Sequence, residues 1–454
     1  MHEETELEFQ DMEEEFDDEF SENIETAGFD PEAPNPIETQ IDRLPEIKKA
    51  VKLTEFKINR KQLVKGLSVA NTASNSMELF EQMVVISGGN SGERGLLRFS
   101  TTSLSAIATK QYLLDTKFEK EFKVAVLLDK VLAIASKLSS KDITLEIYDT
   151  KISLYVSESN SVEVATYNEL IPDIESKTFI DSSNSEDMNN FNYADFIASL
   201  KRINPSLQKF EGNFVYISGK SLLYMSPQGV LESVIKTQNE KLGYYVTTVS
   251  ENIQRLIKFL EEVPSKEIEL TSSYYSLKVE DADQTIKIPY LNFTVKNEDT
   301  KSSFILYLSA VKTSEDEIMK IKNLFKIEQS RKYTKVDISK FMNAISILEL
   351  GLDEDAKTLT LACENKILMV KFSNKFDAAK GRQEIKDCTE EDLPDSSDFD
   401  VNIRYGIYET ILQSIKGKID IELQAVDGGD GMILFKQEND IGEIFKAILP
   451  FEMI

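Results

Sequence analysis

Few residues in this 454-residue chain have the types and spacing that catalysis or metal binding requires. The sequence has one histidine, His2, and two cysteines, Cys363 and Cys388. A folded core therefore has no Ser–His or Cys–His nucleophilic pair and no histidine-based metal site. Two cysteines also build neither a disulfide framework nor a metal knuckle. This cysteine usage favours a reducing, intracellular compartment.

Acidic and glycine clusters are the remaining candidates for a ligand site. Asp353–Asp355 and Asp427–Asp430 lack the spaced ligands and distal glutamate of a calcium-binding loop, so we interpret both as turns. Gly88, Gly89 and Gly92 are not followed by the Gly-Lys-Ser/Thr of a phosphate loop. No carboxylate cluster has the distinctive spacing of a metal-dependent nuclease. We therefore predict no cofactor, no metal and no catalytic residue.

The charge of the chain is concentrated at its N-terminal end. The formal net charge is −27, from 52 basic and 79 acidic residues. Residues 1–40 hold 16 acidic and no basic residues, and the remainder, with 63 acidic against 52 basic, carries −11. Because such a stretch repels itself and buries little apolar surface, we predict a disordered acidic tail over 1–48. Its apolar residues leave a docking role open; they are Leu7, Phe9, Phe16 and Phe20.

Membrane insertion and secretion are not expected. No apolar run approaches the roughly 20 residues that span a bilayer. The acidic beginning of the chain does not resemble a signal peptide. We expect a cytoplasmic protein with no membrane partner.

A helical pattern recurs six times along the chain. Its apolar residues stand at i, i+3, i+4 and i+7, which indicates one buried helical face. Short alternating or β-branched runs, bounded by turn residues, separate these segments. The predicted unit is an amphipathic helix on an antiparallel sheet, an α+β arrangement. Pairs of units predict three domains, at 49–182, 188–300 and 333–454, with 301–332 as a linker or insertion. The six helical segments are 59–74, 127–141, 193–209, 250–263, 337–350 and 404–418.

Four segments resemble bacterial-type DNA polymerase III beta subunits. Phe56–Lys65 is similar to the family's opening strand and first helix, and Ala165–Asp173 to the segment that closes its first domain. Phe399–Tyr405 resembles the start of the last half-domain, and Ala447–Ile454 the C-terminal strand and tail. The order agrees along the chain after residue 50. The acidic tail, the insertion at 296–332 and the acidic loop at 377–397 depart from the family and suggest a divergent member, encoded by a phage.

The resemblance implies a DNA clamp fold and the function of a sliding clamp, a polymerase processivity factor without enzymatic activity. Two copies of three domains would form a head-to-tail homodimer ring lined by helices. The ring would hold double-stranded DNA topologically, without sequence specificity. The other implied partners are a DNA polymerase and a clamp loader.

Charges on the six helical segments fit a pore. They sum to +7 in a chain of −27, although segments 250–263 and 337–350 carry −1 each. The alternative interpretation is that these side chains only solubilise the helices. The predicted DNA-facing residues are Arg60, Lys61, Lys65, Lys130, Lys137, Lys141, Lys201, Arg202, Arg255, Lys258, Lys340, Arg404 and Lys416.

The resemblance also implies a pocket between the second and third domains that binds a short peptide with apolar anchors. Ser226–Gly229 lacks the charged residues usual in the family, so we expect a different peptide preference. The alternative is that the same residues are core and edge residues of a strand. The predicted pocket residues are Leu231, Leu449, Pro450, Phe451 and Met453.

A second class of function stays open from the sequence alone. An acidic interaction protein or DNA mimic would bind replication or transcription factors. A mimic predicts acidic outer faces on the repeated helices, whereas a clamp predicts basic ones.

Overall fold

The structure is a computed structural model. It describes residues 50–157, 160–177, 187–210, 214–235, 243–247, 250–278, 285–307, 313–326, 331–352, 358–364, 367–373, 380–385, 389–390, 399–425, 430–439 and 442–453. The predictions for the acidic tail, for Cys388, for Asp353–Asp355 and for Asp427–Gly429 lie outside these residues.

One unit recurs six times in the described part of the chain: a strand leads into a helix, and three strands follow. The first two units are β1 (Lys52–Asn59), α2 (Arg60–Asn71), β2 (Met83–Ser91), β3 (Arg94–Thr102), β4 (Ala106–Leu114), then β5 (Phe122–Leu127), α3 (Leu128–Lys137), β6 (Asp142–Tyr148), β7 (Lys151–Ser157), β8 (Asn160–Ala165). The next two are β9 (Asp187–Asn192), α5 (Tyr193–Lys209), β10 (Phe214–Ile217), β11 (Ser221–Ser226), β12 (Gly229–Val234), then β13 (Tyr245–Thr247), α6 (Ser250–Glu262), β14 (Glu267–Lys278), β15 (Thr285–Asn297), β16 (Thr300–Tyr307). The last two are β17 (Arg331–Asp337), α8 (Ile338–Glu349), β18 (Leu359–Glu364), β19 (Ile367–Ser373), β20 (Lys380–Glu384), with a short β21 (Thr389–Glu390), then β22 (Phe399–Ile403), α9 (Tyr405–Leu412), β23 (Lys418–Ala425), β24 (Asp430–Asn439), β25 (Gly442–Met453).

Capping residues fix the point where a leading strand becomes a helix. Asn59, Asn192 and Asp337 each end a strand, and each side chain accepts a hydrogen bond from a backbone N–H in the first helical turn, at 2.9, 3.1 and 2.9 Å. Such caps satisfy donors that the helix itself leaves unpaired. The six predicted helices are confirmed, and the prediction of 193–209 coincides with α5.

Leading strands are exchanged within each pair of units. β1 pairs with β6 of the second unit, and β5 pairs with β2 of the first. β9 and β13 pair with β14 and β10 in the same way, as do β17 and β22 with β23 and β18. The exchange makes two units interdependent. It agrees with pairing units into domains, although the predicted boundaries themselves stay a prediction.

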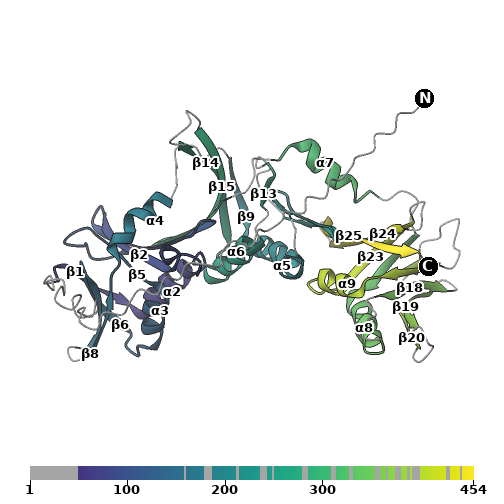
Figure 1. Cartoon of the computed structure of the whole chain (residues 1–454), viewed down its shortest axis with the longest axis horizontal. Coiled ribbons are helices and arrows are strands. Elements are labelled where there is room, and N and C mark those ends of the chain that lie inside the picture. The colour runs from purple at the N-terminus through teal and green to yellow at the C-terminus, as the bar shows by residue number, and fades with distance from the viewer. Residues whose placement is uncertain are drawn as a thin grey trace, which may run out of the picture. The chain divides into compact units, whose positions relative to one another are not determined.

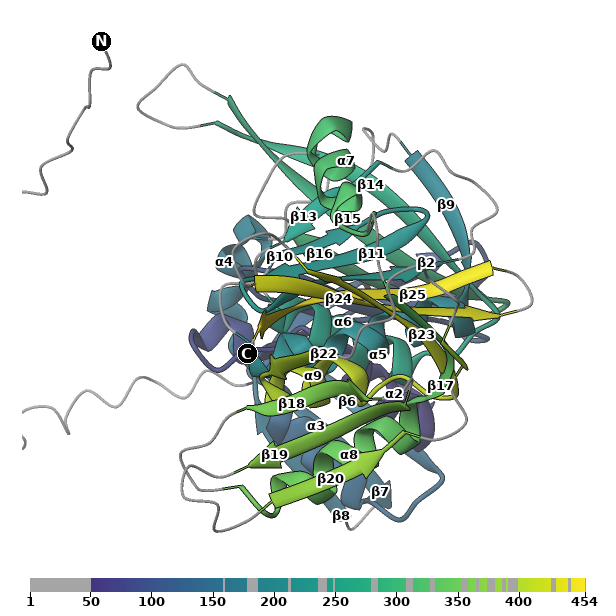
Figure 2. The same ribbon diagram turned by 90° about the vertical axis from the view of Figure 1, so that its right-hand side faces the viewer.

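Last strands join one pair of units to the next. β4 of the first unit pairs with β16 of the fourth, and β12 of the third pairs with β25 of the sixth. The described strands consequently form an eight-stranded and a thirteen-stranded sheet, beside a four-stranded sheet of order β1-β6-β7-β8. β24 and β25 run side by side across the largest sheet (Figure 2).

The segment predicted as a linker begins with a sheet strand. β16 covers Thr300–Tyr307 and pairs on both sides, with β15 and β4, so the prediction of a linker from residue 301 is wrong there. Its Phe304 and Leu306 are fully buried, and this apolar burial outweighs the polar composition of the surrounding residues. The same segment contains the helix α7 (Glu315–Asn323).

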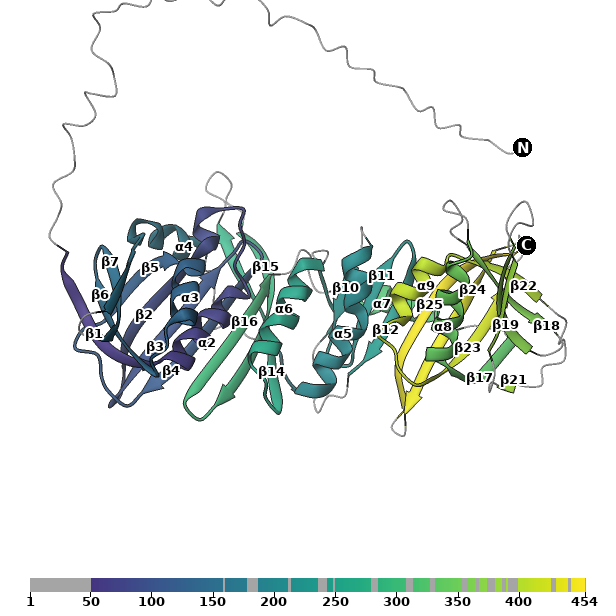
Figure 3. The ribbon, with the colours of Figure 1, turned by 90° about the horizontal axis from the view of Figure 1, so that it is seen from below.

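The six repeated helices form one row. Each helix of the row contacts the next one, in the order α3, α2, α6, α5, α9 and α8 (Figure 3). They pack on one face of the sheets, whereas α4 (Ile171–Lys177) and α7 lie on the other (Figure 1). Strand alternation explains the two faces: Val124 and Val126 pack with the α2–α3 core, and the intervening Ala125 packs with Ile174 of α4.

A buried lysine lies where the first and fourth units join. Lys110 of β4 is 7% exposed and donates a hydrogen bond to Ser302 Oγ of β16 at 2.9 Å. Burial, and secondarily the charge of Lys65, lowers the pKa of Lys110 to about 8. At neutral pH the protein therefore carries a poorly solvated charge at this join.

Replacing Lys110 with methionine tests how much this poorly solvated charge destabilises the folded protein. Between pH 8 and about 10.4 the unfolded chain binds more protons at Lys110 than the folded chain, so wild-type stability rises with pH across that window. We expect Lys110→Met to raise the free energy of unfolding by about 1–2 kcal/mol at pH 7, because removing the charge outweighs losing the Ser302 hydrogen bond. Urea unfolding at pH 7 and pH 10 measures the effect. The gain should shrink at pH 10, and a gain independent of pH would contradict the explanation.

Candidate nucleic-acid interface and partner pocket

Exposed cations occur on every helix of the row except α9, where they lie in the flanking residues. Lys130 and Lys137 of α3 are exposed on the side opposite the buried Leu128, Val131 and Ala135. In the described part of the chain neither lysine forms an ion pair. The other exposed members of the predicted DNA-facing set are Lys61, Lys141, Lys201, Lys258, Lys340, Arg404 and Lys416.

Two arginines of the predicted set link elements of the fold. Arg60 Nη1 donates to the carbonyl oxygens of Ser136 and Leu138, at 3.2 and 2.5 Å, and so caps the C-terminal end of α3. Arg202 Nη1 donates to Ser233 Oγ of β12 at 3.2 Å. Burial lowers the pKa of Arg202, and the carboxylate of Asp195 partly opposes this shift. Both side chains are half-buried, so structural contacts occupy much of their hydrogen-bonding capacity.

Arg255 does not face the row's exposed side. Its side chain is 6% exposed and pairs with Glu251 Oε1 at 2.7 Å. It also donates to Ser103 Oγ and Ser105 Oγ, at 3.2 and 3.3 Å. The prediction that Arg255 faces DNA is therefore wrong, because α6 turns this position toward the β3–β4 connection. The i, i+4 glutamate was the available signal in the sequence.

Two lysines of the predicted set are neutralised by α6. Lys65 Nζ of α2 lies 2.6 Å from Glu262 Oε2. Lys201 Nζ of α5 lies 2.6 Å from Glu261 Oε1. The negative sum of segment 250–263 thus reflects carboxylates that pair with basic neighbours on both sides.

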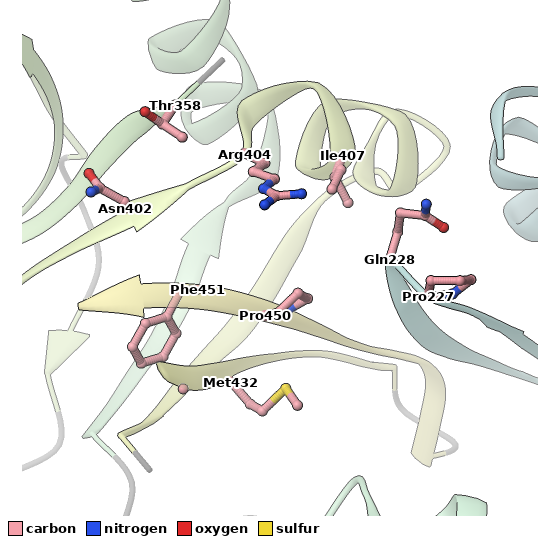
Figure 4. A pocket seen from close by; sticks show the side chains of 10 residues that line it. Pro227, Gln228, Thr358, Asn402, Arg404, Ile407, Met432, Pro450 and Phe451 are labelled. Atoms are coloured by element: carbon pink, nitrogen blue, oxygen red, sulfur yellow. The ribbon is translucent and has the colours of Figure 1, made fainter. Parts of the chain in front are cut away.

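A cavity of about 490 Å³ opens where β25, β24 and the start of α9 approach the β11–β12 turn. Figure 4 shows Arg404 and Ile407 above β25, with Pro227 and Gln228 of the turn across the gap. Met432 is 38% exposed and supplies a flexible apolar surface. The complete lining is Pro227, Gln228, Thr358, Asn402, Arg404, Ile407, Gly431, Met432, Pro450 and Phe451.

The structure separates the predicted pocket residues into two groups. Pro450 and Phe451 line the cavity. Leu231 and Leu449 do not: both are fully buried in the main hydrophobic core, which also contains Phe451 at 4% exposure. The side chain of Met453 lies outside the described residues. Arg404, predicted to face DNA, also lines this cavity.

The turn beside the cavity depends on glycine. Gly229 has φ +155°, and a Cβ there would lie 2.7 Å from the Ile448 carbonyl oxygen and 2.7 Å from Leu449 Cδ2. Glycine therefore lets the β11–β12 turn approach β25 closely, which brings Pro227 and Gln228 to the cavity. Tyr408 Oη donates to the Pro450 carbonyl oxygen at 2.9 Å and fixes α9 over the same strand.

The described residues contain no cluster of three or more histidine, cysteine or acidic side chains able to hold a metal. None of their helices is both long and apolar enough to cross a bilayer.

Comparisons with known proteins identify the fold. No family model matches the sequence, and no curated protein matches it significantly. The DNA polymerase III subunit beta of Pseudomonas aeruginosa matches with a TM-score of 0.66 at 12% identity, over 88% of this chain and 100% of that one. The beta subunit of Thermotoga maritima matches with a TM-score of 0.63 at 10% identity, over 88% and 100%. A putative beta subunit from Eubacterium rectale gives 0.63 at 12% identity, over 87% and 98%. The predicted α+β DNA clamp fold is thus confirmed: this chain folds like the bacterial DNA polymerase III beta subunits.

Proposed function

We propose that the protein is a sliding clamp, a processivity factor that encircles duplex DNA and tethers a polymerase to it. In this proposal it has no catalytic activity. Two copies assemble head to tail into a ring, a clamp loader places the ring on DNA, and the helix row lines the hole. The solved structures with this fold include proteins described as DNA polymerase sliding clamps, which supports the proposal.

The strand-pairing pattern carries the proposal. Last strands pair between units one and four and between units three and six. Units two and five remain, and their last strands, β8 and β20, stand at sheet edges among the described strands. An exposed edge is a template for pairing with another chain. Pairing β8 of one copy with β20 of another would complete the pattern at both ends.

The helix row ends at the same two places. α3 contacts β8, and α8 contacts β20, so both layers of the fold terminate together. Apolar side chains are exposed there: Val162 of β8 at 40%, Ile347 and Leu350 at and after the end of α8 at 44% and 87%. Different surfaces meeting head to tail form a closed ring when the rotation closes. Twelve packed helices, at about 10 Å each, give a circumference of about 120 Å, enough for a duplex and water.

The lysines on the helix row suit loose retention of DNA. Exposed ammonium groups contact phosphates without reading bases, so they hold a duplex without fixing its position. The competing DNA-mimic function needs acidic faces in the same place. The exposed lysines of α3, Lys130 and Lys137, favour the clamp.

The cavity near Met432 is the proposed polymerase-binding pocket. Its volume of about 490 Å³ and its mixture of Met432, Pro450 and Phe451 with Arg404 suit a short peptide with apolar anchors and one acidic group. A methionine-lined surface also adapts to more than one partner.

Light scattering and retention on DNA test the ring. We expect the mass of two chains, and retention on nicked circular DNA that is lost when the DNA is cut. A topological link explains this difference, because only a free end releases a closed ring. A single-chain mass together with equal behaviour on both DNA forms would refute the proposal.

Replacing Leu350 with glutamate tests the head-to-tail interface. Burying an unpaired carboxylate costs several kcal/mol, so we expect the mass to fall to that of one chain at micromolar concentration. Met319→Glu is the control, since Met319 of α7 is also exposed, at 58%, and α7 packs with β10, β11 and β12, strands other than β8 and β20. If Leu350→Glu keeps the mass of wild type, α8 does not form the interface.

Replacing Met432 with aspartate tests the pocket. We expect the dissociation constant of a fluorescent peptide with leucine and phenylalanine anchors to rise at least tenfold, because an anchor contact is lost and a charge is introduced. Assembly mass should not change, and Met319→Asp should bind the peptide like wild type. Undiminished peptide binding by Met432→Asp would place the partner site elsewhere.

A further inference from the structure

α6 lies in the middle of the helix row and reaches both neighbours with consecutive carboxylates. Glu262 pairs with Lys65 of α2, and Glu261 pairs with Lys201 of α5, each at 2.6 Å. Consecutive helical residues are about 100° apart around the axis, so the two side chains point toward opposite flanks. One acidic pair therefore neutralises one lysine on each adjoining helix.

Stability is a weak explanation for these two pairs. The four side chains are between 38% and 51% exposed, and because solvent screens ion pairs at such positions, they contribute little to the stability of the fold. The two pairs have a larger effect on the positive charge that the helix row presents to solvent. Because Arg255 is buried against Glu251, α6 itself presents Lys258 as its exposed cation. At the end of the row, α3 presents both Lys130 and Lys137.

Solvent reaches the paired groups. A polar cavity of about 450 Å³ lies between α2 and α6, lined by Ser68, Asn71, Lys258, Glu261 and Glu262 among others. A phosphate oxygen on the exposed side of the row could replace a carboxylate as the partner of Lys65 if that carboxylate lost its charge.

We propose that Glu261 and Glu262 limit how strongly the centre of the helix row holds DNA. This inference rests on the proposed clamp function. Each lysine that binds a phosphate releases counterions and adds salt-dependent affinity. A clamp that must slide benefits from fewer such contacts, and the acidic pair of α6 withdraws Lys65 and Lys201 from them.

The double variant Glu261→Gln/Glu262→Gln tests the proposal, since glutamine keeps the size of glutamate and one acceptor oxygen but removes the charge. Binding of the intact protein to a fluorescent duplex is measured between 50 and 200 mM salt. Two additional phosphate contacts should steepen the slope of log affinity against log salt by about 1.8. The change in affinity between 50 and 200 mM salt should then exceed that of wild type by about tenfold.

A matched control separates this effect from net charge. Glu175 pairs with Lys123, and Glu269 pairs with Lys296. Both pairs lie on the sheet face away from the helix row, because Lys123 shares the face of Ala125, and Glu269 alternates with the core residues Ile268 and Leu270. Glu175→Gln/Glu269→Gln removes the same charge and frees the same number of lysines. It should leave the slope at the wild-type value.

Removing the lysines completes the test. Lys65→Gln/Lys201→Gln should not steepen the slope, because it leaves Glu261 and Glu262 negative and unpaired and adds no phosphate contact. Combined with the two glutamine substitutions on α6, it should abolish their gain in slope. A slope change equal to that of the control, or a gain that survives loss of both lysines, overturns the proposal. Wild-type retention on circular DNA reports the clamp function separately, so failure of either idea can be recognised.

Discussion

Pairing between last strands is the constraint on which the arrangement of this protein depends. Leading strands are exchanged inside each pair of units, so every pair is tied internally. The third strand after a helix lies at the edge of its unit. At two joins this strand pairs with the corresponding strand of another unit: β4 pairs with β16, and β12 pairs with β25. Because backbone hydrogen bonds continue through both joins, the helices beneath the sheets are brought into a single row. The same rule leaves β8 and β20 as edges, from which the proposed ring follows.

The charge that each surface presents depends on where its residues lie in the fold, and it cannot be inferred from the net charge of the chain. Acidic side chains accompany the lysines at the centre of the row, as Glu261 and Glu262 do, whereas α3 at its end carries exposed Lys130 and Lys137. Buried cations belong to the joins: Lys110 lies on the β4–β16 pair, and Arg255 is held against the β3–β4 connection. A summed helix charge of +7 therefore overstates the cations available to a ligand on the exposed side.

The sequence predicted the repeat, the six helices and the α+β arrangement because these depend on local periodicity, whereas the DNA clamp fold was implied by the resemblance. Apolar spacing of 3.6 residues and an Asn or Asp cap define α2, α5 and α8 without reference to distant residues. Partners across the chain are not visible in such patterns. The burial of Arg255 against Ser103 and the pairing of Lys65 with Glu262 join residues 152 and 197 positions apart. Only the folded arrangement brings these residues together.

The pocket could likewise be predicted only in part from the sequence, even for residues of one strand. The resemblance identified the end of the last strand, and Pro450 and Phe451 do line the cavity. Leu449 and Leu231 of the paired strand β12 lie in the core, and Phe451, which shares the face of Leu449, lies in the same core but also reaches the cavity. The remaining lining comes from α9, β22, β24, the β11–β12 turn and Thr358 before β18, and the turn reaches the other elements because β12 pairs with β25 and Gly229 admits close contact. The pairing that joins successive units therefore also builds the cavity proposed to recruit a partner.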